Sequence, residues 1–197
     1  MAKQHLSGVV VAGCLAGALA CGSKPPAQGA AGGVIPTYND QTGRLTQLKS
    51  DRDKDGKIDT WATMDGSRVV KIEIDENGDG KPDRWEYYKP GTGAEASGVL
   101  ERVEVATRFD GKVSRREFLE NGHLARIEED TDGNGATDKW ETYKDGGLVL
   151  MELDTSQRGK PDRRLVYGAD GSLDHIEADA DGSGNMKSVT PAGRSAK

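Results

Sequence analysis

Three segments of the chain carry carboxylate or amide side chains at alternate positions of a short loop. They read DRDKDGKIDTW from Asp51, DENGDGKPDRWE from Asp75 and DTDGNGATDKWE from Asp130. In each segment positions 1, 3, 5 and 9 are Asp or Asn, and position 6 is glycine. Alternate oxygen-bearing side chains converge on one centre when the glycine makes the sharp turn, and Ca²⁺ prefers such oxygens. The pattern therefore predicts Ca²⁺ as the cofactor.

The second and fourth copies of this loop also have a glutamate at position 12. A bidentate carboxylate at that position completes a seven-oxygen sphere around calcium. The first copy has Ala62 there, so water would take that place and binding would be weaker. The candidate metal ligands are Asp51, Asp53, Asp55 and Asp59 in the first copy, Asp75, Asn77, Asp79, Asp83 and Glu86 in the second, and Asp130, Asp132, Asn134, Asp138 and Glu141 in the fourth.

Three further copies have lost part of the ligand set. The third has Ala106 and Arg108 at positions 1 and 3, the fifth has Arg158 at position 5, and the sixth has Lys187 at position 9. An arginine that pairs with local carboxylates would leave a metal-free turn of the same shape. All the copies also admit a second interpretation as solvated turns, because Asp, Asn and Gly tolerate left-handed conformations and bond their own backbone.

The loops belong to a repeat that covers most of the chain. Asp51 and Asp75 are 24 residues apart, as are Asp130 and Asp154. Each unit has a strand-like run with apolar residues spaced two and three apart, then the loop, a second strand, and a tight Asp-Gly or Asn-Gly turn. Such dipeptides between apolar runs indicate hairpins. The expected fold is all-β, a repetitive antiparallel β-meander of about six two-stranded units joined by Asp/Gly-rich loops.

Repeated glutamates favour the antiparallel arrangement over a parallel solenoid. The five that share a repeat position are Glu73, Glu104, Glu128, Glu152 and Glu177. In a parallel solenoid they would stack about 4.8 Å apart as like charges. In an antiparallel meander they lie two strands apart, and the intervening Lys and Arg side chains can compensate their charge.

The N-terminal segment predicts export. Lys3 precedes an uncharged, mostly apolar stretch from Leu6 to Ala20 that is too short to span a bilayer, as expected of a signal peptide. Ala18-Leu19-Ala20-Cys21 resembles the lipobox of bacterial lipoproteins, although Ala18 stands where that family usually has leucine. The resemblance implies lipidation of Cys21, and Ser23 implies outer-membrane sorting. Cys14, after Val11-Ala12-Gly13, is the alternative lipidation site, and an ordinary secretory signal is another.

We therefore expect four segments along the chain. These are a lipoprotein signal peptide at 1–20, the lipidated cysteine and a flexible tether at 21–36, a β-repeat domain at 37–189, and a disordered tail at 190–197. The net charge of −6 argues against binding nucleic acid, which requires clustered Lys and Arg. Hydrophobic residues make up 34% of the chain and aromatic residues 5%, so a thick core is not expected.

The loops resemble those of EF-hands and, more closely, the DxDxDGxxD loops of thrombospondin type 3 repeats. The flanks differ from EF-hands, because strands rather than helices are expected on both sides. No nucleophile–base pair or phosphate-binding loop is recognisable, so we do not expect an enzyme. The leading hypothesis is a lipid-anchored, calcium-binding protein of the cell envelope with a structural or adhesive role. The alternative is a metal-independent module that binds a protein or a polysaccharide, for which Trp61, Trp85 and Trp140 could form a sugar-binding platform.

Overall fold

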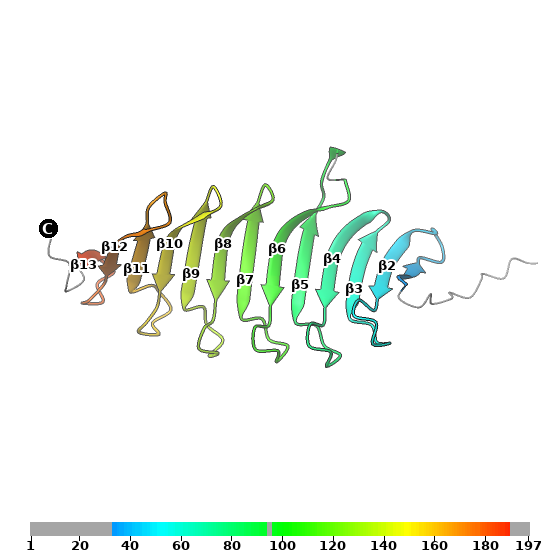
Figure 1. The fold of residues 1–197 in the computed structure, drawn as a ribbon, viewed down its shortest axis with the longest axis horizontal. Coiled ribbons are helices and arrows are strands. Elements are labelled where there is room, and N and C mark those ends of the chain that lie inside the picture. Colours follow the sequence, from blue (N-terminus) through cyan, green and yellow to red (C-terminus); the bar gives the residue numbers. More distant parts are fainter. Residues whose placement is uncertain (1–32, 94–95, 190–197) are drawn as a thin grey trace, which may run out of the picture.

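The computed structural model describes residues 33–93 and 96–189, and these form one 13-stranded antiparallel sheet with strands in chain order (Figure 1). The all-β meander predicted from the sequence is confirmed. Its strands are β1 (Ile35–Tyr38), β2 (Leu45–Ser50), β3 (Thr60–Asp65), β4 (Arg68–Ile74), β5 (Arg84–Lys89), β6 (Val99–Val105), β7 (Arg115–Glu120), β8 (His123–Glu129), β9 (Lys139–Lys144), β10 (Gly147–Leu153), β11 (Arg163–Tyr167), β12 (Leu173–Ala178) and β13 (Lys187–Val189).

The signal peptide, Cys14, Cys21 and the expected tail at 190–197 lie outside the described residues. The β-repeat begins at Ile35, two residues before the boundary expected from the sequence. The described part of the chain contains no helix long and apolar enough to cross a membrane.

The meander separates its two kinds of connection onto opposite edges of the sheet. The six Asp/Gly-rich loops lie along the lower edge in Figure 1, and the shorter turns lie along the upper edge together with residues 90–93 and 96–98 between β5 and β6. We number the lower loops 1 to 6 by their first residues: Asp51, Asp75, Ala106, Asp130, Asp154 and Asp179. The candidate ligands at positions 1, 3, 5 and 9 of the loops are thus all on this edge of the sheet.

Every hairpin at the upper edge contains a β-bulge at an equivalent place. In β3–β4, for example, Thr63 pairs with Lys71 and Met64 pairs with Val69, so Val70 has no partner. The same register shift occurs in the other five hairpins. The extra residue of the bulge keeps Val69 and Ile72 on one face although they are three positions apart. This explains why apolar residues in the sequence are spaced three as well as two apart.

The repeated glutamates lie on one face, in a row with the tryptophans. The cross-strand register gives the order Trp61, Glu73, Trp85, Glu104, Arg116, Glu128, Trp140, Glu152, Arg164 and Glu177. Positive side chains pair with these glutamates, as in Lys71–Glu73 at 2.8 Å and Arg164–Glu152 at 2.7 Å. Lysine and arginine side chains therefore compensate the charge of the repeated glutamates, as expected for an antiparallel meander.

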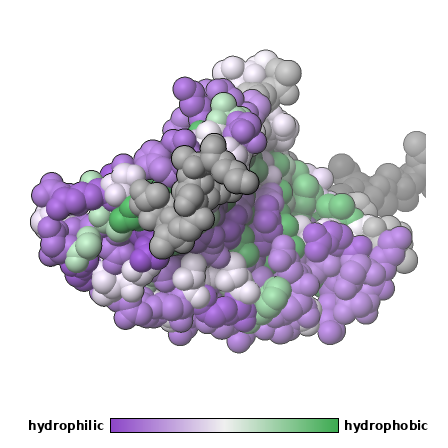
Figure 2. All heavy atoms as spheres, turned by 60° about the vertical axis from the view of Figure 1, so that its left-hand side comes forward, coloured by the Kyte–Doolittle hydropathy of each residue, from purple (hydrophilic) through white to green (hydrophobic). Residues whose placement is uncertain are grey.

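The opposite face carries the small apolar core. Only Val103, Ala106 and Ile127 are buried hydrophobic residues in the described part of the chain. Val103 and Ile127 are in one cross-strand row with three glutamates, Glu86, Glu117 and Glu141. Figure 2 shows hydrophobic residues gathered between broad hydrophilic regions. The described residues form no second layer, and the glutamates of this row flank the two apolar side chains on the same face.

The buried polar residues are concentrated in the lower loops. Eight are buried, and seven of them occupy position 1 or position 9 of a loop. Asp75, Asp154 and Asp179 are at position 1, whereas Asp59, Asp83, Ser114 and Asp162 are at position 9, and the eighth residue is Glu141. The loops therefore supply more of the buried interior than the apolar core does.

The central apolar residue Ile127 should contribute strongly to stability. Its side chain is 1% exposed, so we expect Ile127→Ala to lower the free energy of unfolding by roughly 2–4 kcal/mol. The matched control is Val70→Ala at the β4 bulge, because Val70 is 37% exposed and should cost under about 0.5 kcal/mol. Urea unfolding measures both variants, and equal losses would contradict this description of the core.

Candidate metal-binding loops

All six lower loops share a backbone conformation with two left-handed residues. Position 6 is always a glycine with positive φ, as the sequence pattern required. Position 4 is also left-handed in every loop, although it is a glycine only in loops 2, 4 and 6. Lys54, Phe109 and Gln157 adopt this strained conformation in the odd-numbered loops, with φ between 55° and 66°. Glycine at position 4 of three loops was the available sequence signal for this second turn position, which the pattern of acidic residues did not use.

Where positions 1 and 9 are aspartates, their carboxylates close the loop by accepting backbone N–H groups. Asp75 Oδ1 accepts from Gly78 N at 2.8 Å and its Oδ2 from Gly80 N at 2.7 Å. Asp83 Oδ2, at position 9, accepts from Glu76 N at 3.2 Å. Side chains at positions 3 and 5 bond amides two residues later, as Asn77 does with Asp79 N. These bonds offset the cost of burying the carboxylates.

Neighbouring loops are joined to one another by a backbone ladder. The carbonyl of position 9 in one loop accepts the N–H of position 1 in the next, beginning with Asp75 N to Asp59 O at 2.8 Å. Four equivalent bonds continue along the edge, donated by Ala106, Asp130, Asp154 and Asp179 at 2.7 to 2.9 Å. A change in the conformation of one loop therefore acts directly on its neighbours.

Two loops bring three carboxylates together. In loop 1 ligand oxygens of Asp51, Asp53 and Asp59 all lie within 4.8 Å of one another, and in loop 4 those of Asp130, Asp132 and Asp138 do the same. The members at position 3, Asp53 and Asp132, are exposed. These two acidic groups could hold a metal ion, and they contain residues from positions 1, 3 and 9 of the sequence pattern.

The remaining candidate ligands lie outside these groups. Asp55 accepts Lys57 N and forms an ion pair with Lys57 Nζ at 3.6 Å. Asn134 accepts Ala136 N. In loop 2 the three aspartates, Asp75, Asp79 and Asp83, do not form a group of this kind within the described residues.

The glutamates at position 12 lie on strands and are not part of these groups, which differs from the expectation for them. Glu86 in β5 accepts from Arg84 Nε at 2.9 Å and from Tyr88 Oη at 2.7 Å. Glu141 in β9 is paired with Lys139 Nζ and accepts from Tyr143 Oη, both at 2.8 Å. A helix after the loop would bring position 12 back toward the ion, but an extended strand carries it away along the sheet.

Loop 2 contains a buried carboxylate oxygen without a partner. Asp83 is fully buried, and its Oδ1 makes no hydrogen bond. In loops 4 and 5 a threonine hydroxyl at position 2 bonds the position-9 carboxylate, as Thr131 does to Asp138 at 2.8 Å. Loop 2 has Glu76 at that position, which has no hydroxyl to donate. The missing donor accounts for the unsatisfied oxygen.

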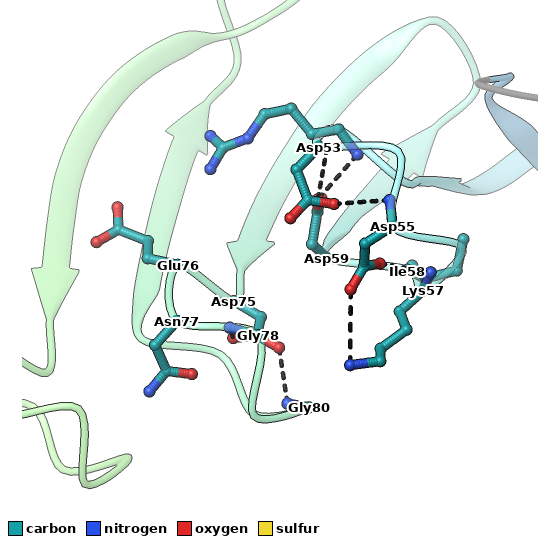
Figure 3. A pocket seen from close by; sticks show the side chains of 11 residues that line it. Asp53, Asp55, Lys57, Ile58, Asp59, Asp75, Glu76, Asn77, Gly78 and Gly80 are labelled. Carbon is teal, nitrogen blue, oxygen red and sulfur yellow. Dashed lines mark hydrogen bonds and ion pairs between the residues drawn. The ribbon is translucent and has the colours of Figure 1, made fainter.

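A groove of about 360 Å³ separates loops 1 and 2 (Figure 3). Asp53 and Asp55 come from the first loop, and Glu76 and Asn77 from the second. The groove is open and rich in oxygen atoms, so hydrated cations can reach the exposed ligands of loop 1.

The shifted pKa values follow the same contacts. Burial acts to raise the pKa of Asp130, but bonds from the amides of Gly133 and Gly135 and from Arg108 outweigh it and lower the pKa. Burial likewise opposes the lowering at Glu141, where Lys139 and Tyr143 prevail. Burial and the bond to Glu141 raise the pKa of Tyr143 to about 12. The lowered pKa values of Asp130 and Glu141 therefore keep these two carboxylates ionised at neutral pH.

Comparisons with known proteins do not place the chain in a family. No protein-family model matches it, and no curated protein does. Among solved structures, the crystal structure of accessory secretory protein 1, 2 and 3 of Streptococcus pneumoniae is 16% identical, over 61% of this chain and 19% of that chain. Its TM-score is 0.29, so the similarity carries no argument about fold or function.

The lowered aspartate pKa values predict destabilisation by acid. Shifts below the ordinary value occur at Asp59, Asp130, Asp154, Asp162 and Asp181, and hydrogen bonds from Ser183 and neighbouring groups bring Asp181 to about 2. In the unfolded chain an aspartate has a pKa of about 3.9. Stability from these groups is therefore complete above about pH 4 and is lost as the pH falls toward the folded-state values. Denaturant unfolding in chelator between pH 6 and pH 2 measures this, and constant stability across that range would contradict it.

Proposed function

We propose that this chain is a non-catalytic calcium-binding repeat protein in which loops 1 and 4 hold the ions. The observation that carries the proposal is the convergence of three carboxylates in each of these loops, with the position-3 aspartate exposed to solvent. Three like charges within 4.8 Å repel one another, and a divalent cation offsets that repulsion. Asp55 in loop 1 and Asn134 in loop 4 are further oxygen donors close in sequence.

The expected affinity is modest. Loop 1 has Ala62 at position 12, and Glu141 of loop 4 is engaged by Lys139 and Tyr143 on the strand, so water must complete the coordination sphere in both. Affinities of about 10⁻⁴ to 10⁻³ M are typical of extracellular calcium modules. Such values suit a protein outside the cytoplasm, in agreement with the export signal and with Cys21 as a lipid anchor in the outer membrane.

The proposed role is structural or adhesive. Ion binding would stiffen an edge whose loops are already joined by a backbone ladder, and the thin core makes the sheet sensitive to the order of that edge. Because the unfolded chain has no preformed site, the free energy of binding stabilises the fold.

Binding of a polysaccharide by the sheet face is the second candidate function. Trp61 and Trp85 lie in one cross-strand row on the same face, with only Glu73 of β4 between them. That places them two strand spacings apart, about 9.5 Å. Aromatic rings can stack on sugars, and the carboxylates beside them can accept hydrogen bonds from the sugar hydroxyl groups. Unlike the loop sites, such binding would persist in chelator.

Calcium titration calorimetry tests the proposal through its position-3 ligands. Asp53→Asn and Asp132→Asn each keep an oxygen that can accept the amide of position 5 but remove one charge from the group. We expect each variant to lose one of two sites or to weaken it by about tenfold or more. Asp145→Asn is the matched control, because Asp145 lies in the β9–β10 turn with φ of 52°, which asparagine tolerates well.

The two possible failures are distinct. If the wild-type protein takes up no calcium at 5 mM, a concentration about five times the weakest expected dissociation constant, the loops are turns and not ion sites. If it binds calcium but the Asp53 and Asp132 variants bind as the control does, the ions lie elsewhere on the molecule.

A further inference from the structure

We infer that Arg108 of loop 3 serves as a tethered cation for loop 4 and competes there with calcium. This inference rests on the proposed function, because it concerns the regulation of one of its two sites. Arg108 makes loop 4 a weaker calcium site than loop 1 and stabilises the metal-free form of loop 4.

The Arg108 side chain crosses from its own loop to the next one. Its Nη1 and Nη2 donate to the backbone carbonyl of Asp130 at 3.1 and 3.2 Å, and Nη2 also reaches Asp130 Oδ2 at 3.2 Å. The same carboxylate accepts Gly133 N on Oδ1 and Gly135 N on Oδ2. The guanidinium therefore takes an acceptor position on Oδ2 that a metal ion would require.

The Arg108 guanidinium lies over Gly133 of loop 4, in the space that a side chain at this position would occupy. A Cβ added to Gly133 would be 2.9 Å from Arg108 Nη2 and 3.1 Å from its Nε. Gly133 is left-handed, yet equivalent residues in the odd-numbered loops are Lys54, Phe109 and Gln157, so φ alone does not require glycine there. The close approach of Arg108 is a second reason for glycine at this position.

Loops 2 and 6 provide the comparison. Arg158 of loop 5 stands over Gly182 of loop 6, where an added Cβ would meet its Nη1. Over Gly78 of loop 2 nothing lies within 4 Å of the corresponding Cβ. Arginines thus come from the two odd-numbered loops that have lost acidic ligands, and each lies on the even-numbered loop that follows.

The charges explain why Arg108 would compete with calcium. Asp130 is a member of the three-carboxylate group of loop 4, and its side chain is only 12% exposed. A guanidinium at 3.2 Å and a calcium ion on the same carboxylate would repel each other across a few ångströms. Loop 1 differs, because among the described residues no lysine or arginine forms an ion pair with Asp51, Asp53 or Asp59, and the charge that acts on Asp59 is that of Arg52 within the same loop. Loop 1 is therefore the internal reference for the experiment.

The test compares calcium binding and thermal unfolding of the full chain in four forms: wild type, Arg108→Gln, Arg108→Lys, and Arg108→Gln combined with Asp132→Asn. Glutamine removes the charge but keeps an amide donor, whereas lysine keeps the charge. We expect Arg108→Gln to raise the calcium affinity of one site by about tenfold and to lower the unfolding midpoint in chelator. Arg108→Lys should resemble the wild type, and Asp132→Asn should abolish the gain.

The outcomes separate this inference from the function on which it rests. If loop 1 binds calcium normally and Arg108→Gln leaves the affinity of the second site unchanged, the competition by Arg108 is overturned and the calcium proposal stands. If none of the four forms binds calcium, both are overturned. A gain in affinity that survives Asp132→Asn would also overturn the inference, because the gain would not arise in loop 4.

Discussion

The structure depends on carboxylates that accept the backbone N–H groups of the same loop. A single-layer sheet cannot bury its strands against a second layer, and only three hydrophobic side chains are buried in the described residues. Instead the residues at positions 1 and 9 of the lower loops fill the interior of one edge, where backbone amides bond most of their oxygens and leave Asp83 Oδ1 and Asp179 Oδ1 without a partner. Buried carboxylates of this kind fix the loop geometry, because each unsatisfied oxygen or amide would cost about 1–3 kcal/mol.

This constraint also relates the loops to the sheet. The ladder from position 9 of one loop to position 1 of the next continues the strand pairing into the edge. Loops that lack the acidic set keep the same backbone: Ser114 replaces the position-9 aspartate in loop 3 and its hydroxyl accepts Thr107 N at 3.1 Å. The shared shape is therefore independent of metal, whereas cation binding depends on which oxygens converge. Those are separate properties of one repeat.

Much of the architecture could be predicted from the sequence. The Asp-Gly and Asn-Gly turns, together with five glutamates at one repeat position, indicated an antiparallel meander, and the meander is present. The bulges were not recognised, although the three-residue spacing between Val69 and Ile72 contained their signal. A strict alternation would have placed these residues on opposite faces, so the irregular spacing itself identifies the extra residue.

The site was less predictable than the fold. The sequence pattern grouped positions 1, 3, 5 and 9 around one centre, and in loops 1 and 4 the oxygens of positions 1, 3 and 9 lie together. Glu86 and Glu141 do not lie in these groups. Position 12 is a ligand in loops that a helix follows, whereas strands β5 and β9 follow loops 2 and 4. The contact between Arg108 and Asp130 joins residues 22 apart, which no local pattern reveals.

We propose that cations in the acidic loops stabilise a sheet with almost no apolar core. Thermal unfolding in chelator, in millimolar calcium and in millimolar magnesium tests it most directly, since binding to the folded state alone raises the midpoint. We expect the unfolding midpoint to rise by several degrees with calcium and much less with magnesium, which requires a stricter octahedral site. An unfolding midpoint that is the same in chelator and in calcium would contradict it.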